Sequence, residues 1–143
     1  MTHTEKIHKK GFTLIELMIA IAVFAIISLV VIPNVLKYMK DAKISSAKAN
    51  LQVLKGAITQ YQLSINQLPT RLTDLVKSPA DEKAKKKWTG SFLEKTEVPE
   101  DPWGEKYQYK VNAAGASHPY ELYSFGENGK GAPKAEWIDV WDL

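Results

Sequence analysis

The side chains that could do acid–base or nucleophilic chemistry are scattered along this sequence. His3 and His8 lie in the first eleven residues, and His118 stands alone beside a proline. Glu100 and Asp101 are neighbours at a predicted turn. Their carboxylates are therefore not expected to point at one reacting group, as a general acid–base pair would have to. The sequence also contains no glycine-rich phosphate loop and no nucleophile motif. It therefore predicts that the protein is not an enzyme.

The cysteine count and the net charge of the chain limit which kinds of binding site and partner it can have. The 143 residues include no cysteine, so disulfides and thiolate metal sites are excluded. The formal net charge is +3, from 19 basic and 16 acidic residues. The first eleven residues hold three of those lysines and one glutamate, so 16 basic residues face 15 acidic ones in the rest of the chain. The basic character of the chain is therefore weak evidence for a nucleic-acid partner.

A second concentration of positive charge occurs between Ala80 and Trp88. Its four lysines are Lys83, Lys85, Lys86 and Lys87. They could form a patch for nucleic acid or anionic lipid, but a solvated helix face or loop is the simpler interpretation. A single tryptophan without an ordered aromatic series gives weak support to a stacking platform for bases. We therefore expect no nucleic-acid partner.

One carboxylate stands in an unusual place. From Phe12 to Ile32 the sequence has 21 residues and one charge, Glu16. As a helix this stretch would reach roughly 32 Å, about the thickness of the hydrocarbon core of a bilayer. A carboxylate inside a membrane span costs a few kcal/mol. Glu16 either lies near the headgroups, where the helix dipole favours it, or forms an ion pair that exists only in one state of the protein.

The apolar stretch is expected to remain as a membrane anchor. Lys9 and Lys10 precede it, and positive charge keeps that end of a span in the cytoplasm. The stretch ends in the sequence from Val30 to Val35, which contains no small-x-small cleavage site of the secretory type. The rest of the chain is therefore expected on the far side of the membrane.

A single long helix is predicted from Phe12 to about Tyr61 or Leu63. Apolar residues at helical spacing form one stripe in its second half, namely Ala47, Leu51, Leu54, Ile58, Tyr61 and Ile65. Pro33 falls where the apolar stretch ends and is expected to kink or locally open the helix. The alternative is that Pro33 ends the helix.

The remainder predicts a small α+β head. Residues 72–76 are expected to form a short helix capped by Thr70. The segment Asp101-Pro102-Trp103-Gly104 fits a type I turn. Alternation then predicts a strand at residues 105–111. The next strand is expected at 120–125 and a third at 137–141. Three antiparallel strands could cover the apolar stripe of the long helix.

At the N-terminus, Gly11-Phe12-Thr13-Leu14-Ile15-Glu16-Leu17 resembles the prepilin cleavage motif of type IV pilins and type II secretion pseudopilins. The resemblance implies that a prepilin peptidase cuts after Gly11 and N-methylates Phe12, and that Glu16 is the assembly glutamate. It divides the chain into a leader (1–11), a membrane and filament-core half of the helix with Pro33 at its end (12–33), and a periplasmic head that includes the rest of the helix (34–143).

The head carries a second resemblance. The segments from Asp101 to Tyr109 and from Ser124 to Gly129, with Leu68-Pro69-Thr70, are similar to the major pseudopilins of type II secretion. This implies a pilin-like fold and an inner-membrane subunit that polymerises into a periplasmic pseudopilus, which drives the export of folded proteins. The implied partners are copies of the chain, minor pseudopilins, the prepilin peptidase, the inner-membrane secretion platform and, before assembly, membrane lipid.

Two other interpretations remain open at this point. One stays in the same superfamily and makes the chain a type IV pilin or a competence pseudopilin. The other makes it a membrane-tethered binding module whose anchor merely resembles a prepilin, and it predicts no cleavage after Gly11.

The same resemblance raises the question of calcium in the C-terminal loop. Major pseudopilins usually bind Ca²⁺ there, and the candidate ligands in this chain are Glu127, Asn128, Glu136 and Asp139. The loop departs from the family pattern, because Asn128 replaces a common aspartate and Lys130 and Lys134 intrude. The alternative is that packing of Trp137 and Trp141 holds the loop without a metal.

Overall fold

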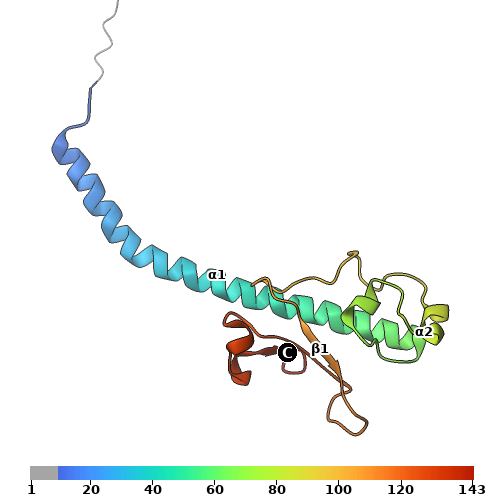
Figure 1. Ribbon diagram of the computed structural model, residues 1–143. Coiled ribbons are helices and arrows are strands. Elements are labelled where there is room, and N and C mark those ends of the chain that lie inside the picture. The colour runs from blue at the N-terminus through green and yellow to red at the C-terminus, as the bar shows by residue number, and fades with distance from the viewer. Residues whose placement is uncertain (1–9) are drawn as a thin grey trace, which may run out of the picture. The chain divides into compact units, whose positions relative to one another are not determined.

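The structure of the protein is a computed structural model, which describes residues 10–143 (Figure 1). His3, His8 and most of the expected leader lie outside the described residues. The chain divides into two compact units, one ending at Met39 and the other comprising Lys40–Leu143.

Helix α1 spans Leu14–Ile65. Its start lies two residues after the predicted one, because Thr13 is the residue that caps it. At the other end, Asn66 adopts a left-handed conformation with φ of 67° and donates its N–H to the Gln62 carbonyl at 2.8 Å. A left-handed residue directly after the last helical one is a common helix terminator.

Pro33 lies inside α1 and does not end it. The alternative in which the helix stops at Pro33 is therefore wrong. The amide of the next residue, Asn34, donates through Nδ2 to the Val30 carbonyl oxygen at 3.0 Å. A polar side chain in this apolar segment is thus satisfied by its own helix, as a low-dielectric surrounding requires.

The second unit builds its core on the apolar stripe of α1. The stripe residues predicted from the periodicity are buried, and Ala57 joins them: Ala47, Leu51, Leu54, Ala57, Ile58, Tyr61 and Ile65. The stripe residues from Leu51 onward form one cluster with residues of the head, namely Leu72, Leu75, Ala84, Leu93, Tyr107, Tyr120, Leu122 and Val140. Helix periodicity predicted this face because burial along a helix follows its 3.6-residue repeat.

The head adds short elements to α1 in this order: η1 (Leu72–Leu75), α2 (Glu82–Lys87), β1 (Gln108–Val111), β2 (Tyr120–Ser124), η2 (Gly129–Gly131), η3 (Lys134–Glu136) and β3 (Ile138–Asp139). The sheet has the order β1-β2-β3 with both pairs antiparallel. In the register, Tyr109 pairs with Leu122 and Ser124 with Ile138. This confirms the predicted α+β fold with a three-stranded antiparallel sheet, although each strand is shorter than predicted.

Helix α2 explains the lysine run. Asp81 caps it, and its carboxylate accepts the Ala84 N–H at 2.9 Å. Ala84 is buried, whereas all four lysines of the run are exposed. The structure thus gives the lysines the solvated helix face that was the simpler interpretation.

Candidate functional site

The start of α1 places Glu16 in a reciprocal cap with Thr13. The Thr13 N–H donates to Glu16 Oε2 at 2.9 Å, and the Glu16 N–H donates to Thr13 Oγ1 at 3.3 Å. This is a capping box, in which two otherwise unpaired N–H groups of the first turn are satisfied. The sequence signal for this cap is Thr-x-x-Glu at residues 13–16, and the cap was not among the predictions.

The cap settles where the carboxylate lies in the isolated chain. Glu16 sits in the first turn of α1, where the positive end of the helix dipole favours an anion. Only Oε2 accepts a hydrogen bond from the described residues, so Oε1 remains available. In the single chain, Glu16 therefore has the arrangement that the helix dipole favours.

Gly11 and Phe12 lie in an irregular segment directly before α1. The Phe12 side chain is 93% exposed, and an added Cβ on Gly11 would meet no atom within 4 Å. Both residues that flank the Gly11–Phe12 bond are therefore exposed. The large apolar residues that follow in the first unit are also exposed, from Leu14 at 75% to Met39 at 56%.

Within the described residues, α1 is the helix long and apolar enough to cross a membrane. Its most apolar window has none of its residues buried inside the molecule. A large exposed apolar surface marks a membrane or protein contact.

In the head, Asp101 is a buried carboxylate that organises the turn before β1. It is only 5% exposed. Its Oδ1 accepts the N–H groups of Trp103 at 3.1 Å and Glu105 at 2.8 Å. The Gly104 N–H donates to the Asp101 carbonyl at 3.0 Å, which confirms the predicted turn.

The second oxygen of Asp101 reaches the end of β2. Ser124 Oγ donates to Asp101 Oδ2 at 2.6 Å and accepts the Gly126 N–H at 3.0 Å. Ser124 is fully buried. One carboxylate thus connects the turn before β1 to the residue from which the C-terminal loop departs. The sequence motif identified the turn, but the link to Ser124 was not predicted.

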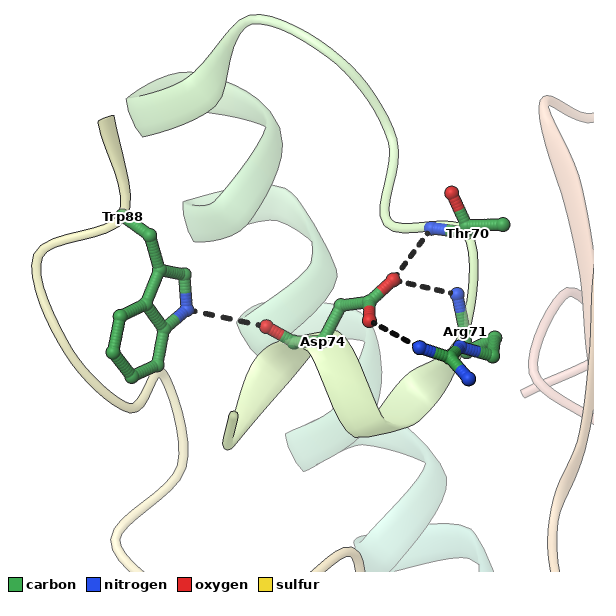
Figure 2. Close-up of polar contacts among 4 residues, drawn as sticks. All are labelled: Thr70, Arg71, Asp74 and Trp88. Carbon is green, nitrogen blue, oxygen red and sulfur yellow. Dashed lines mark hydrogen bonds and ion pairs between the residues drawn. The ribbon is translucent and has the colours of Figure 1, made fainter. Parts of the chain in front are cut away.

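A second buried carboxylate, Asp74, holds the turn before η1 (Figure 2). Its Oδ2 accepts the N–H groups of Thr70 at 3.1 Å and Arg71 at 3.0 Å. Its Oδ1 lies 3.6 Å from Arg71 Nη2, and its carbonyl accepts the Trp88 indole N–H at 3.2 Å. The prediction that Thr70 caps this helix is wrong, because Arg71 is the N-cap residue and Thr70 is a donor to Asp74.

Replacing Asp74 with alanine is expected to lower the free energy of unfolding by about 2 kcal/mol, because two N–H groups in a partly buried turn lose their acceptor. Thermal unfolding followed by tryptophan fluorescence measures the loss. Asp74→Asn keeps an acceptor oxygen and removes only the charge facing the exposed Arg71, so it should be nearly neutral. A loss with asparagine as large as that with alanine would contradict this assignment.

The four candidate calcium ligands do not converge. Glu127 Oε2 is bound by the Lys40 ammonium at 2.7 Å. The Asn128 amide donates through Nδ2 to Glu136 Oε2 at 2.7 Å. Asp139 lines a different cavity, and its Oδ1 accepts the Trp141 N–H at 3.0 Å. Only Glu127, Asn128 and Glu136 therefore line one cavity. Their side chains contact Lys40 or each other and do not point at one common position.

These residues do not fit a calcium ion. Calcium takes six to eight oxygen ligands at about 2.3–2.6 Å. Within residues 10–143, no group of three or more His, Cys, Asp or Glu side chains is arranged to hold a metal. A lysine ammonium on one of two nearby carboxylates also repels a divalent cation.

Comparison with known proteins assigns the family. Residues 34–141 match the family described as type II secretion system (T2SS), protein G. The chain belongs to the type II secretion system protein G family. Residues 6–32 match the prokaryotic N-terminal methylation motif. The relationship to major pseudopilins that the two sequence motifs indicated is thereby confirmed.

The similarity to individual members of the protein G family covers nearly the whole chain. The type II secretion system core protein G of Pseudomonas aeruginosa is 35% identical over 140 residues, which cover 94% of the chain and 96% of that protein. Its counterpart in Escherichia coli K12 is 30% identical over 146 residues, covering 100% and 97%. The chain also resembles the crystal structure of the major pseudopilin from the type 2 secretion system of enterohaemorrhagic E. coli, with a TM-score of 0.62. At 24% identity over 80% of the chain and 99% of that structure, this likeness establishes the pilin-like fold.

In this protein G homologue, aromatic stacking packs the C-terminal segment. Trp137 stacks on Tyr123 with ring centroids 4.4 Å apart, and its indole N–H donates to the Ala132 carbonyl at 3.0 Å. The Trp141 ring stacks on the His118 ring with centroids 4.4 Å apart, and the Lys55 ammonium lies 4.2 Å from the Trp141 ring centroid. Trp137 and Trp141, the two residues whose packing the sequence offered as the alternative to calcium, thus both make aromatic contacts.

Proposed function

We propose that this chain is a major pseudopilin, a structural subunit that polymerises through the first half of α1 into the periplasmic pseudopilus of type II secretion. Growth of the filament then drives folded proteins across the outer membrane. The observation that carries the proposal is the exposed apolar half-helix that follows a capped glutamate, in a chain of the protein G family. The family match favours this function over a type IV pilin or competence pseudopilin.

In this proposal the exposed apolar surface of α1 contacts first the membrane and then the neighbouring subunits of the filament. Before assembly it spans the inner membrane as a single pass, with the head in the periplasm and lipid as its partner. After assembly the same side chains pack against those of neighbouring subunits. The exchange is feasible because both surroundings are apolar, so that transfer from one to the other does not require apolar surface to enter water.

Processing after Gly11 supplies the charge that the proposal needs. A prepilin peptidase removes residues 1–11 and methylates the new amine of Phe12, which remains a cation. Glu16 Oε1 is available to receive it, because the capping box uses Oε2. Within one chain the cap already holds the carboxylate at the start of the helix. We therefore assign the Phe12 ammonium to the Glu16 of a neighbouring subunit.

The ion pair would fix the axial register of the filament. A pair of opposite charges in a low-dielectric core is far better than either charge alone, although apolar residues would cost less. Subunits therefore add where the pair can form. Pro33 ends the segment, 12–33, that we assign to the filament core, and the remainder, 34–143, contacts the minor pseudopilins and the secretion platform.

Mass spectrometry of the N-terminus tests the processing step. We expect the membrane fraction to yield a chain that begins at methylated Phe12, because the Gly11–Phe12 bond is exposed. In a strain without prepilin peptidase the full-length chain should accumulate instead. A chain that keeps residues 1–11 in the presence of the peptidase would favour the membrane-tethered binding module.

A further inference from the structure

The ammonium of Lys40 lies where two carboxylates of the C-terminal loop meet the second half of α1. Its Nζ is 2.7 Å from Glu127 Oε2, with the two side chains 56% and 49% exposed. The hydrogen bond and the charge of Glu127 raise the pKa of Lys40, and the charges of Glu136 and Asp41 act in the same direction. Lys40 therefore faces both loop glutamates.

The loop glutamates and Lys40 line one cavity between the helix and the loop. The cavity has a volume of about 300 Å³, and Trp103 and Gly126 form part of its wall. Asn128 lies in the same wall and binds Glu136 at 2.7 Å. Gly126 allows the approach, because its φ is 76° and a Cβ there would stand 3.1 Å from the Glu136 carbonyl oxygen.

Two carboxylates that line one cavity repel each other, and two kinds of cation could offset that repulsion. A divalent ion such as Ca²⁺ needs six or more oxygen ligands, and the side-chain oxygens of this loop do not converge on one point. A lysine ammonium needs only a carboxylate and a direction of approach, because it brings three N–H donors on a flexible stem. The helix supplies that direction, because Lys40 is an exposed residue of α1 whose ammonium reaches the loop at Glu127.

We propose that the Lys40 ammonium is a built-in counter-cation that pins the loop of residues 126–137 to α1, in place of a divalent metal ion. The head of this chain thus keeps its fold without calcium. The inference concerns the unassembled chain, so it stands or falls independently of the proposed function in secretion.

The first test uses the full-length chain in detergent, with Trp fluorescence as the readout of thermal unfolding. We expect the same melting temperature in excess EGTA and in millimolar CaCl₂, and no heat of Ca²⁺ binding by calorimetry. A melting temperature that rises with Ca²⁺, or stoichiometric Ca²⁺ binding, would overturn the proposal. This comparison needs no variant, so it remains informative even if a substituted chain does not fold.

The second test assigns the stability to Lys40. Lys40→Met should lower the melting temperature, whereas Lys43→Met, at an exposed lysine on the same helix, should not. Lys40→Arg keeps the cation and should retain most of the stability. Glu127→Gln should lower the melting temperature as Lys40→Met does, and the double variant should lose little more, because each change breaks the same pair. Equal melting temperatures for Lys40→Met and Lys43→Met would contradict the assignment.

Discussion

Replacing Glu16 with alanine is expected to abolish recovery of the chain in pseudopili while leaving its cleavage after Gly11 intact. Without the carboxylate, each added subunit would bury the Phe12 ammonium unpaired. Breaking a buried pair in this way costs about 3–5 kcal/mol, which corresponds to a loss of roughly a hundredfold or more in the equilibrium for adding a subunit. The measurement is the amount of chain in sheared filaments relative to the processed chain in membranes.

Two further variants separate the charge of Glu16 from its role as a cap. Glu16→Gln keeps an acceptor for the Thr13 N–H but removes the charge, so it should fail to assemble as alanine does. Thr13→Ala removes one half of the capping box but keeps the carboxylate, so it should assemble better than either Glu16 variant. Normal filament yield from Glu16→Gln would rule out the ion pair with Phe12.

Replacing Asp101 with alanine should destabilise the head more than replacing Asp74 does. It removes the acceptor for two backbone N–H groups and for the buried Ser124 hydroxyl. Donors left unpaired in a buried site cost about 1–3 kcal/mol each, and relaxation recovers part of this, so we expect a total loss of about 3 kcal/mol. For a unit of this size the melting temperature would fall by roughly 14 °C.

A conservative substitution at Asp101 and a substitution at a remote exposed carboxylate serve as controls for the loss of stability in Asp101→Ala. Asp101→Asn keeps one oxygen for the two backbone donors and turns an N–H₂ group toward Ser124, so its effect should be smaller. Asp142→Ala removes an exposed carboxylate near the C-terminus and should change the melting temperature little. If Asp101→Ala were no more destabilising than Asp142→Ala, the assigned role of the buried carboxylate would be wrong.

The elements with a repeating signal were predictable from the sequence. The stripe from Ala47 to Ile65 recurs at helical spacing, and each of its six predicted members is buried. Alternation likewise indicated the position of β1, although strand pairing there covers only Gln108–Val111. Periodicity reports which side of an element is buried, but it does not report where pairing ends.

The polar contacts were harder to foresee, because they depend on which of several acceptors reaches a donor. Thr70 was a reasonable cap by type, yet Asp74 has the longer reach and accepts the Thr70 N–H itself. The pair of Lys40 and Glu127 joins distant parts of the sequence with no spacing rule between them. The capping box of Glu16 was readable from a local motif, since it depends only on residues 13–16.

The aromatic contacts at the end of the chain have a consequence for the timing of folding. The apolar face of α1 is complete once Ile65 has been synthesised, but Val140 belongs to the core that covers it, and Trp141 lies over Lys55. In the proposed topology the head crosses the inner membrane starting from its N-terminal side, so this face would stay uncovered until the last few residues have crossed. During that interval the uncovered face is vulnerable to aggregation, and a periplasmic chaperone would have its greatest effect on the chain then.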